Sequence, residues 1–306
     1  MNLPPKVVSI GEVLWDVLPS GPQLGGAPAN LACHVRALGA AADLISRVGH
    51  DRLGDEALGL LAARAIDLAG VVRDPHRPTG TVAVELTADG QPRFEIIEAV
   101  AWDSITATDH SLDRARRADA VCFGSLAQRS PEARHAIQRL VAACRPSSLR
   151  VFDINLREPF YDDDVIESSL HLANVLKLNE AELPVVARQF GLRGSVQEQI
   201  EALAQRFALD VVALTQGASG SRVLRGGRWT FEAGRTVSVV DAVGAGDAYT
   251  AGLVLGLLLQ WPTEELLKRA TDVAAFVCTC AGATPRLPEQ LVAPFADALD
   301  ASAGRT

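Results

Sequence analysis

The feature that most constrains the fold is an alternation between short apolar runs, rich in β-branched residues, and longer stretches with helical periodicity. This alternation continues along almost the whole chain, and it predicts a mainly parallel sheet with helices on both faces. The runs expected to form its strands are Val7–Ile10, Asp43–Val48, Ala120–Phe123, Val151–Ile154, Val175–Leu178, Val211–Leu214 and Thr236–Val240.

The stretches between these runs carry helix start and stop signals. Helices are expected over Pro28–Leu38 and Asp55–Ile66, with Gly70 closing the second region. Ser130 precedes a proline and is expected to cap a helix that runs to about Cys144.

Two hairpin patterns interrupt the alternation. Residues 80–98 hold two strand-like runs around Ala88-Asp89-Gly90, and Asp-Gly is a strong hairpin signal. We expect this hairpin to form a small sheet beside the main domain, with residues 13–24 supplying further strands. The second pattern, Ser221–Phe231, has two glycines at its middle and is expected at an edge of the main sheet.

Composition excludes several classes of protein. The chain has 306 residues and a formal net charge of −8, which argues against nucleic-acid binding as its main activity. Its five cysteines include no CxxC pair, so neither a disulfide framework nor a zinc site is expected. The longest apolar run, Ala251–Leu259, is far shorter than the ~20 residues that span a bilayer. With no apolar leader segment, the chain is expected to be cytoplasmic, with no membrane partner.

The stretch DAVGAGDA at 241–248 predicts an anion site. A long apolar run begins just after it, so a helix must start near Gly246. Gly244 and Ala245 then lie at the helix N-terminus, where the first N–H groups lack partners and the helix dipole favours anions. Glycines let a ligand approach the backbone closely, and a phosphate group fits this description.

Asp247 lies in the first turn of the same helix. A carboxylate beside a phosphate makes chemical sense as a general base that deprotonates a hydroxyl attacking the phosphoryl group. The helix behind it is apolar all round, with Gly252 and Gly256 one turn apart, which suits a rigid central helix. On these residues alone, an acidic cap over a tight turn without chemistry is an equal alternative. The chain has neither a P-loop nor a G-x-G-x-x-G fingerprint after a strand.

DAVGAGDA resembles the C-terminal signature of the ribokinase-like carbohydrate kinases of the phosphofructokinase-B type. Other stretches resemble elements of that family in order and spacing, and together they cover essentially the whole chain. They are GEVLWD (11–16), LGGAPANLACHVRALG (24–39), KLNEAE (177–182), TQGASG (215–220) and GATPRLP (282–288).

The resemblance implies a fold and a division of the chain. The fold is a three-layer α/β/α domain with a mainly parallel central sheet, plus a small β-sheet lid. The large domain would comprise residues 1–11, 26–78 and 103–306, and the lid residues 12–25 and 79–102. In this family lids close over the sugar to exclude water and often mediate dimers, which implies a homodimer through the lid.

The resemblance also implies roles for individual residues. Asp247 would be the catalytic base, with Gly244, Ala245 and Gly246 forming the anion hole. Asn30 as a local cap, Asp16 as a surface acid, and packing of Phe94 and Ile96 within the lid remain alternatives, as does pairing of Arg157 with Asp162 or Asp163. The residues implied to bind the sugar are Asp16, Gly25, Gly26, Asn30, Phe94, Ile96 and Arg157.

For the nucleotide, the resemblance implies a second group of residues. Asn179 and Glu182 would organise Mg²⁺ and the phosphates of ATP, largely through water. Their alternatives are a helix cap and a solvated helical glutamate, and a plain turn is the alternative for the loop at 215–220. Arg286 and Val243 depart from common family residues and put a K⁺ site at Asp241 in doubt. The loop residues implied to line the nucleotide site are Thr215, Gly217 and Gly220.

These features predict an ATP-dependent sugar kinase whose partners are a small sugar and ATP. The strings SRVGHDRLGD (46–55), AWD (101–103) and DINLR (153–157) look most like fructokinases, which makes conversion of D-fructose to fructose 6-phosphate the leading expectation. Kinases of ribose, 2-keto-3-deoxygluconate or a nucleoside are alternatives. So is a non-catalytic sugar or nucleotide sensor on the same scaffold.

Overall fold

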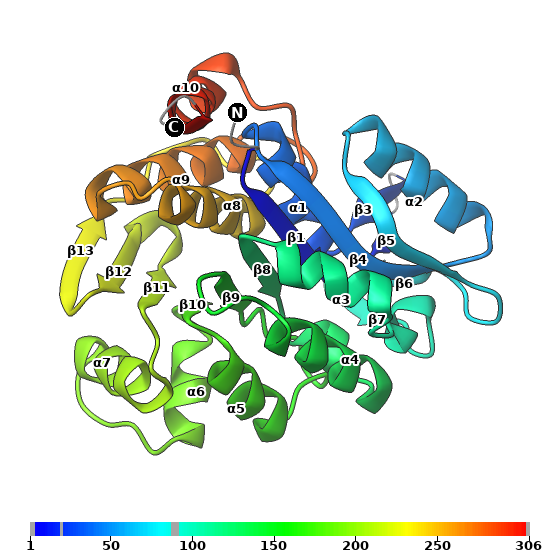
Figure 1. The fold of residues 1–306 in the computed structure, drawn as a ribbon, viewed down its shortest axis with the longest axis horizontal. Helices are drawn as coiled ribbons and strands as arrows, with labels where there is room; N and C mark the ends of the chain where they lie inside the picture. Colours follow the sequence, from blue (N-terminus) through cyan, green and yellow to red (C-terminus); the bar gives the residue numbers. More distant parts are fainter. Residues whose placement is uncertain (1–3, 19–20, 87–91, 304–306) are drawn as a thin grey trace.

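The structure, a computed structural model, describes residues 4–18, 21–86 and 92–303. Within this part of the chain the main element is a nine-stranded sheet (Figure 1). The strand order is β13 (Arg228–Glu232), β12 (Ser221–Arg225), β11 (Val211–Thr215), β10 (Val175–Asn179), β9 (Leu149–Asp153), β8 (Ala120–Phe123), β1 (Lys6–Ile10), β4 (Ala41–Gly49) and β5 (Asp67–Asp74). In this order the seven strands from β11 to β5 are parallel, whereas β12 and β13 pair antiparallel at one edge.

Helices cover both faces of this sheet (Figure 1). Successive side chains of a strand point to opposite faces, so Val7 enters one core cluster while Val8 and Ile10 enter the other. The three-layer α/β/α prediction is therefore confirmed. The first face carries α1 (Ala27–Ala37), α2 (Arg52–Ala63), α8 (Ala245–Leu258), α9 (Thr263–Cys278) and α10 (Glu289–Ala303); the second carries α3 (Asp109–Arg117), α4 (Pro131–Ala142), α5 (Asp163–Leu172), α6 (Leu183–Gln189) and α7 (Val196–Phe207).

Helix α8 is the central helix that its apolar sequence predicts, with every residue from Ala248 to Leu257 buried. Its two interior glycines lie against α9. A Cβ atom on Gly252 would stand 2.8 Å from the Cα atom of Ala270, and one on Gly256 would stand 2.7 Å from Leu266. Side chains there would push the helices apart, so the glycines permit the close packing that holds the start of α8 in place.

The hairpin at 80–98 and the strands at 13–24 form a separate four-stranded sheet, as the sequence predicts. Its strand order is β3 (Gly21–Gly25), β2 (Leu14–Leu18), β6 (Gly80–Leu86) and β7 (Pro92–Ile96). The predicted turn at Ala88-Asp89-Gly90 lies outside the described residues. The chain enters this small sheet from the main domain after β1 and again before β6, and it returns to the main domain after β3 and after β7.

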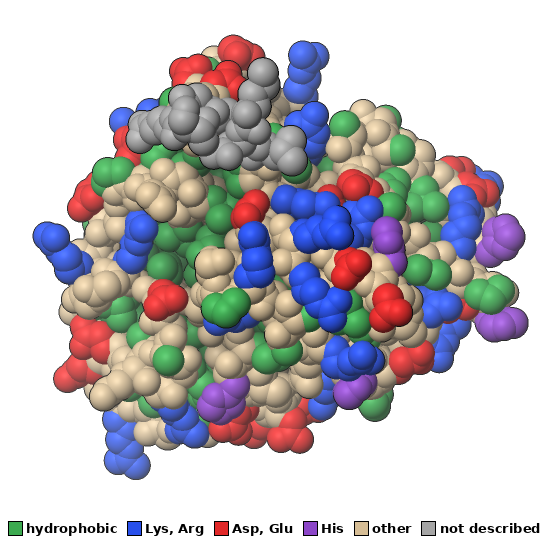
Figure 2. Space-filling view, viewed as in Figure 1, with side chains coloured by type: hydrophobic (Ala, Val, Ile, Leu, Met, Phe, Trp, Pro, Cys, Tyr) green, Lys and Arg blue, Asp and Glu red, His purple; other side chains and the backbone are tan. Residues whose placement is uncertain are grey.

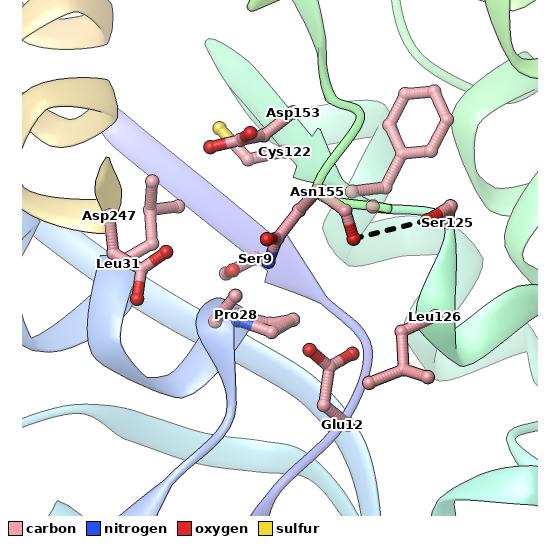
Figure 3. A pocket seen from close by; sticks show the side chains of 13 residues that line it. Ser9, Glu12, Pro28, Leu31, Cys122, Ser125, Leu126, Asp153, Asn155 and Asp247 are labelled. Atoms are coloured by element: carbon pink, nitrogen blue, oxygen red, sulfur yellow. Dashed lines mark hydrogen bonds between the residues drawn. The ribbon is translucent and has the colours of Figure 1, made fainter. Parts of the chain in front are cut away.

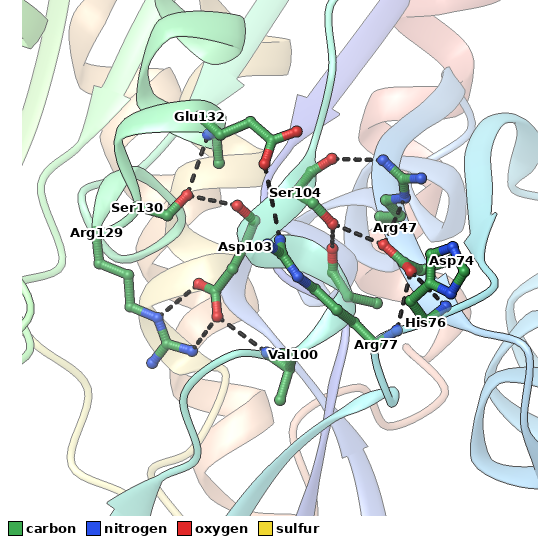
Figure 4. A network of polar contacts seen from close by, with 12 residues as sticks. Arg47, Asp74, His76, Arg77, Val100, Asp103, Ser104, Arg129, Ser130 and Glu132 are labelled. Atoms are coloured by element: carbon green, nitrogen blue, oxygen red, sulfur yellow. Dashed lines mark hydrogen bonds and ion pairs between the residues drawn. The ribbon is translucent and has the colours of Figure 1, made fainter.

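The connection after β7 is fixed by a network of buried ion pairs (Figure 4). The short 3-10 helix η1 (Ala101–Ser104) places Asp103 against Arg129, whose Nε atom lies 2.7 Å from Asp103 Oδ1. The guanidinium group also lies 3.9 Å from the ring centre of Trp102. Ser104 donates to Asp74 at 2.7 Å. The AWD string thus forms a structural anchor at the base of the small sheet.

Two sequence predictions about the main domain are wrong. Thr236–Val240 is not a strand: Val239 is 64% exposed, and the Val240 N–H donates to the Cys278 carbonyl at the end of α9. Gly70 does not close a helix but lies inside β5, where a Cβ atom would stand 2.6 Å from the Leu44 carbonyl oxygen. In both cases the local pattern gave no information on which neighbour was available for pairing.

Acidic and basic side chains are interspersed over the face of the molecule drawn in Figure 2. At the amino ends of the sheet strands, charges of opposite sign lie in contact. Lys6 and Asp43 are 2.7 Å apart, and Arg145 lies 2.8 Å from Asp119. Charges at this end of the strands therefore neutralise one another.

Candidate functional site

The strand order reverses beside β1, which lies between β4 and β8. In open α/β sheets, ligands bind outside the carboxyl ends of the strands at such a switch point. A pocket lies there, with Ser9 of β1, Phe123 of β8 and Asp153 of β9 in its lining (Figure 3). The first turns of α1 and α8 complete it, so the fold brings the two glycine-containing motifs to one place.

The N-terminus of α8 carries free backbone amides next to Asp247, which lines this pocket. Gly244 caps the helix with a positive φ of 78°, and a side chain there would clash with the backbone of Ala283. The Ala245 N–H donates to the Ala242 carbonyl at 3.3 Å, whereas the N–H groups of Gly246 and Asp247 have no partner among the described residues. Of the three residues predicted to form the anion hole, only Ala245 has its N–H group bonded within the turn.

Asp247 connects α8 to α1. Its Oδ2 atom accepts a hydrogen bond from Asn30 Nδ2 at 2.9 Å, and its carboxyl group is partly exposed to the pocket. Burial and the nearby negative charge of Asp153 raise the pKa of Asp247 to about 7, against the opposing effect of the Asn30 bond. A carboxyl group with a pKa near neutrality is suited to accept and release a proton during a reaction.

A buried ion pair lies behind the first turn of α8. Lys177 Nζ is 3.0 Å from Asp153 Oδ1, and its side chain is 7% exposed. The Thr250 hydroxyl donates to Asp153 Oδ2 at 2.7 Å, which ties the pair to the helix. Burial acts against the charge of Lys177, yet the carboxylates of Asp153 and Glu182 raise its pKa. The lysine therefore stays charged beneath the free amides.

Residues expected to bind the sugar lie on the small sheet and at the start of α1, outside the lining of the pocket itself. Asp16 lies on β2 beside Gly25 of β3, and burial raises its pKa. Gly26 caps α1 with φ 102°, because the Glu12 carbonyl leaves no room for a side chain. Asn30 follows one turn later, and its N–H bonds to the Gly26 carbonyl. Asn30 uses its side chain on Asp247 rather than as a cap.

Arg157 is exposed, and its positive charge acts on three carboxyl groups of the site, those of Glu12, Asp16 and Asp247. Its alternative partner Asp162 is instead paired with Arg134 at 2.7 Å.

The two lid side chains proposed to face the sugar are less informative. Ile96 is half-buried against the core cluster on the α3–α7 face of the main sheet. The Phe94 side chain lies outside the described residues.

Asn179 and Glu182 form a closed turn between β10 and α6. The Asn179 side-chain oxygen accepts the N–H groups of Ala181 and Glu182, while Glu182 Oε2 accepts the Asn179 N–H at 2.7 Å. Glu182 Oε1 accepts the Leu156 N–H at 3.0 Å. Since each of these oxygens already accepts at least one backbone hydrogen bond, the pair fits a magnesium ion held through water better than one bound directly.

The loop after β11 is held by its backbone. Gly217 and Gly220 both have positive φ, and a side chain on Gly220 would clash with the Glu232 carbonyl. Thr215 Oγ1 lies 3.4 Å from the Leu178 carbonyl oxygen. Asp241, in the loop that precedes α8, accepts hydrogen bonds from the N–H groups of Val243 and Gly282 at 3.0 and 3.1 Å. Its carboxylate thus ties the glycine turn to the closing segment.

Sequence reasoning missed three buried charges of the site: Glu12, Asp153 and Lys177. Each lies within a motif that was noticed, in GEVLWD, DINLR and KLNEAE respectively. Each also lies within or just after a strand of the parallel sheet, near its carboxyl end. That position is the signal that could have found them, because the carboxyl ends of parallel strands meet at one edge of the sheet.

Comparison with known proteins agrees with this geometry. Residues 21–290 match the family described as pfkB family carbohydrate kinase. The fructokinase of Escherichia coli is 30% identical over 92% of this chain and 96% of its own. The fructokinase-1 of Oryza sativa is 29% identical over 93% of this chain and 95% of its own.

Solved structures share the fold. An uncharacterized sugar kinase from Pyrococcus horikoshii, solved in complex with ATP, superposes with a TM-score of 0.82 at 30% identity, covering 96% of this chain and 99% of its own. Among the described residues, no helix is both long and apolar enough to cross a membrane.

Proposed function

This chain belongs to the pfkB family of carbohydrate kinases, and from that premise we propose that it transfers the γ-phosphoryl group of ATP to D-fructose, giving fructose 6-phosphate. The class of activity, an ATP-dependent sugar kinase, follows from the family. The choice of fructose rests on relatives named fructokinases at about 30% identity, together with the strings of the sequence that look most like those enzymes.

The observation that supports the mechanism most strongly is the position of Asp247 beside free amides at the N-terminus of α8. Its carboxylate is proposed to accept the proton of the attacking sugar hydroxyl. The N–H groups of Gly244, Gly246 and Asp247 are proposed to hold the charge that develops on the transferring phosphoryl group, and that of Ala245 would have to leave its bond to the Ala242 carbonyl to join them. The nearby Lys177–Asp153 pair supports this role, since it fixes the turn and places a positive charge beneath it.

Sugar binding is proposed for residues of the small sheet and of the start of α1, together with Arg157. Asp16 and Asn30 offer carboxylate and amide groups, which pair well with vicinal hydroxyls. Gly25 and Gly26 are proposed to contact the sugar through their backbone, and the positive charge of Arg157 acts on the acidic groups. Contacts from Ile96 and Phe94 of the small sheet stay a prediction.

ATP is proposed to bind along the loop that contains Thr215, Gly217 and Gly220, with Asn179 and Glu182 near its phosphates. Mg²⁺, when bound with ATP, would neutralise charge between the phosphates. Among the described residues no three acidic, histidine or cysteine side chains are placed to hold a metal, which fits an ion carried by phosphates and water. A K⁺ ion near Asp241 would have to use carbonyl oxygens beside it.

The small sheet is proposed to act as a lid of residues 12–25 and 79–102 that closes over the sugar and excludes water. A second copy of the chain could cover the outer face of this sheet, which carries the exposed Val17. Homodimerisation through the lid therefore stays part of the proposal, and sedimentation analysis would test it.

The experiment that tests the function is an assay of ADP release with ATP, Mg²⁺ and a panel of D-fructose, D-ribose, 2-keto-3-deoxygluconate and adenosine. We expect D-fructose to give the highest kcat/KM. Preference for another acceptor would contradict the proposal that D-fructose is the substrate, but it would leave the assignment as a sugar kinase intact. Measurable sugar binding without ADP release on any acceptor would instead support a sensor.

A further inference from the structure

Glu12 is a buried carboxyl group in the pocket without a cationic partner in contact. It follows β1, is 4% exposed and lines the pocket together with Asp247. Among the described residues it makes no ion pair, in contrast to Asp153, which is held by Lys177. Figure 3 shows the Glu12 carboxyl group across the pocket from Asp247, with Pro28 between them and Ser9 beside Pro28.

The surroundings of Glu12 make the ionised form of its carboxyl group energetically unfavourable. Burial raises the pKa of Glu12 to about 7, and the negative charge of Asp247 adds to this. Arg157 and the N–H groups of Glu12 and Ala27 act in the opposite direction. A buried acid that is not fully compensated destabilises a folded protein, so its presence in the pocket calls for a ligand.

The pocket offers that ligand polar partners beside Glu12. Ser9 is 1% exposed, and its Oγ atom has no hydrogen-bond partner among the described residues although it lines the pocket. The cavity volume of the pocket is about 30 Å³, more than the 10–15 Å³ that one water molecule needs. A hydroxyl group with its carbon atom fits such a space, and a carboxyl and a serine hydroxyl can both bind it.

We propose that Glu12 is a specificity-determining residue for the sugar, and that its carboxyl group binds a hydroxyl remote from the phosphoryl acceptor. The acceptor hydroxyl lies at Asp247 and Glu12 lies across the pocket, so the two acids contact different parts of one sugar. This inference rests on the proposed function, because it concerns the same pocket. The alternative role for Glu12 is only to cap the N-terminus of α1 through the Ala27 N–H.

The test combines two variants with deoxy sugars. Glu12→Gln keeps an acceptor for the Ala27 N–H, so a capping role alone would leave sugar recognition unchanged. We expect its KM for D-fructose to rise by about 10- to 100-fold, the cost of losing a hydrogen bond to a buried charged group. Its KM for ATP should stay within about twofold, and its Tm at pH 8 should be unchanged or higher. Glu56→Gln, on the exposed face of α2, is the matched control and should behave as wild type.

Glu12→Ala is then assayed against the 1-, 3- and 4-deoxy analogues of D-fructose. For one analogue, the losses in kcat/KM from the sugar change and from the protein change should not add, because both remove the same hydrogen bond. Additive losses for all three analogues, or an equal rise in both KM values with a lower Tm, would overturn the inference while the kinase activity stands. A wild-type protein inactive on every sugar would overturn the proposed function as well.

Discussion

The two halves of the candidate site are built differently. On the sugar side, Asn30, Asp153 and Lys177 are buried or nearly so and joined to their neighbours by hydrogen bonds. On the nucleotide side, glycine loops run over the surface, with Val240 63% and Val243 50% exposed. Groups that perform proton transfer need fixed geometry and low solvent access, whereas a nucleotide can be held by backbone amides alone. The chemistry should therefore be concentrated in the buried half.

The largest expected effect is on turnover. Asp247→Asn keeps the shape of the side chain but removes the base, so kcat should fall by about 10²–10⁴-fold. The affinity for ATP, measured by calorimetry, should change little because the nucleotide side is left intact. Asp297→Asn, an exposed acid on α10, is the control. Near-normal turnover in Asp247→Asn would remove the proposed difference between the two halves.

The next effect is on stability. Asp153→Asn leaves the charge of Lys177 buried without its partner, and breaking such a pair costs about 3–5 kcal/mol of unfolding free energy. On the nucleotide side, Asp241→Asn weakens only hydrogen bonds to two backbone N–H groups, a loss of about 1 kcal/mol. Urea denaturation of both variants measures the contrast. Equal losses would contradict the view that the Lys177–Asp153 pair stores more buried charge than the turn at Asp241.

Two glycines sharpen the same comparison. Gly217, on the nucleotide side, has φ 51° and no atom within 4 Å of an added Cβ, so Gly217→Ala should cost only about 1–2 kcal/mol from its left-handed backbone. Gly244→Ala adds a clash with Ala283, which would move the free amides of α8. A displacement of about 1 Å can lower kcat roughly 10²-fold. Steady-state kinetics of both variants will show whether kcat depends on the position of the α8 amides or on backbone strain at the glycines.

The smallest effect is on pH dependence. With its pKa raised to about 7, Asp247 is ionised above that pH and protonated below it. The kcat/KM for sugar should therefore fall about tenfold per pH unit below pH 7.

The stability of the protein tests the raised pKa of Asp247 independently, and it changes with pH in the opposite direction to activity. A raised pKa means that the folded protein disfavours the ionised form, so the penalty exists above pH 7 and is lost as pH falls toward the ordinary value of 3.8. The Tm gain of Asp247→Asn over wild type should accordingly be larger at pH 8 than at pH 5. A gain that does not change with pH would contradict the assignment.

Much of the fold could be predicted because strand and helix periodicity are local properties. The hairpin at Ser221–Phe231 and the cap at Ser130 are found where their sequence signals place them. The strand Asp67–Asp74 was not predicted, because Gly70 was interpreted as the end of a helical region. The strand forms because β4 lies directly beside it and pairs with it. Thr236–Val240 has strand chemistry but bonds instead to the end of α9. Pairing partners are a tertiary property that a single segment does not encode.

The candidate site was predictable where a motif has a chemical reason. Asp247 and Gly244 follow from the needs of a phosphoryl group at a helix N-terminus. Glu12 and Lys177 could not be predicted in this way, because their role in the site comes from their burial and from neighbours far away in the sequence. The bond between Asn30 and Asp247 spans 217 residues, and only the fold brings the two together.

A crystal structure of the protein with D-fructose and ADP tests the central claim most directly. We expect the C6 hydroxyl oxygen of the sugar to lie about 2.6–3.2 Å from a carboxylate oxygen of Asp247, the reach of a general base. The amides of Gly246 and Asp247 should face the gap between that oxygen and the nucleotide. A sugar bound elsewhere, or an Asp247 side chain turned away from every hydroxyl, would contradict the account.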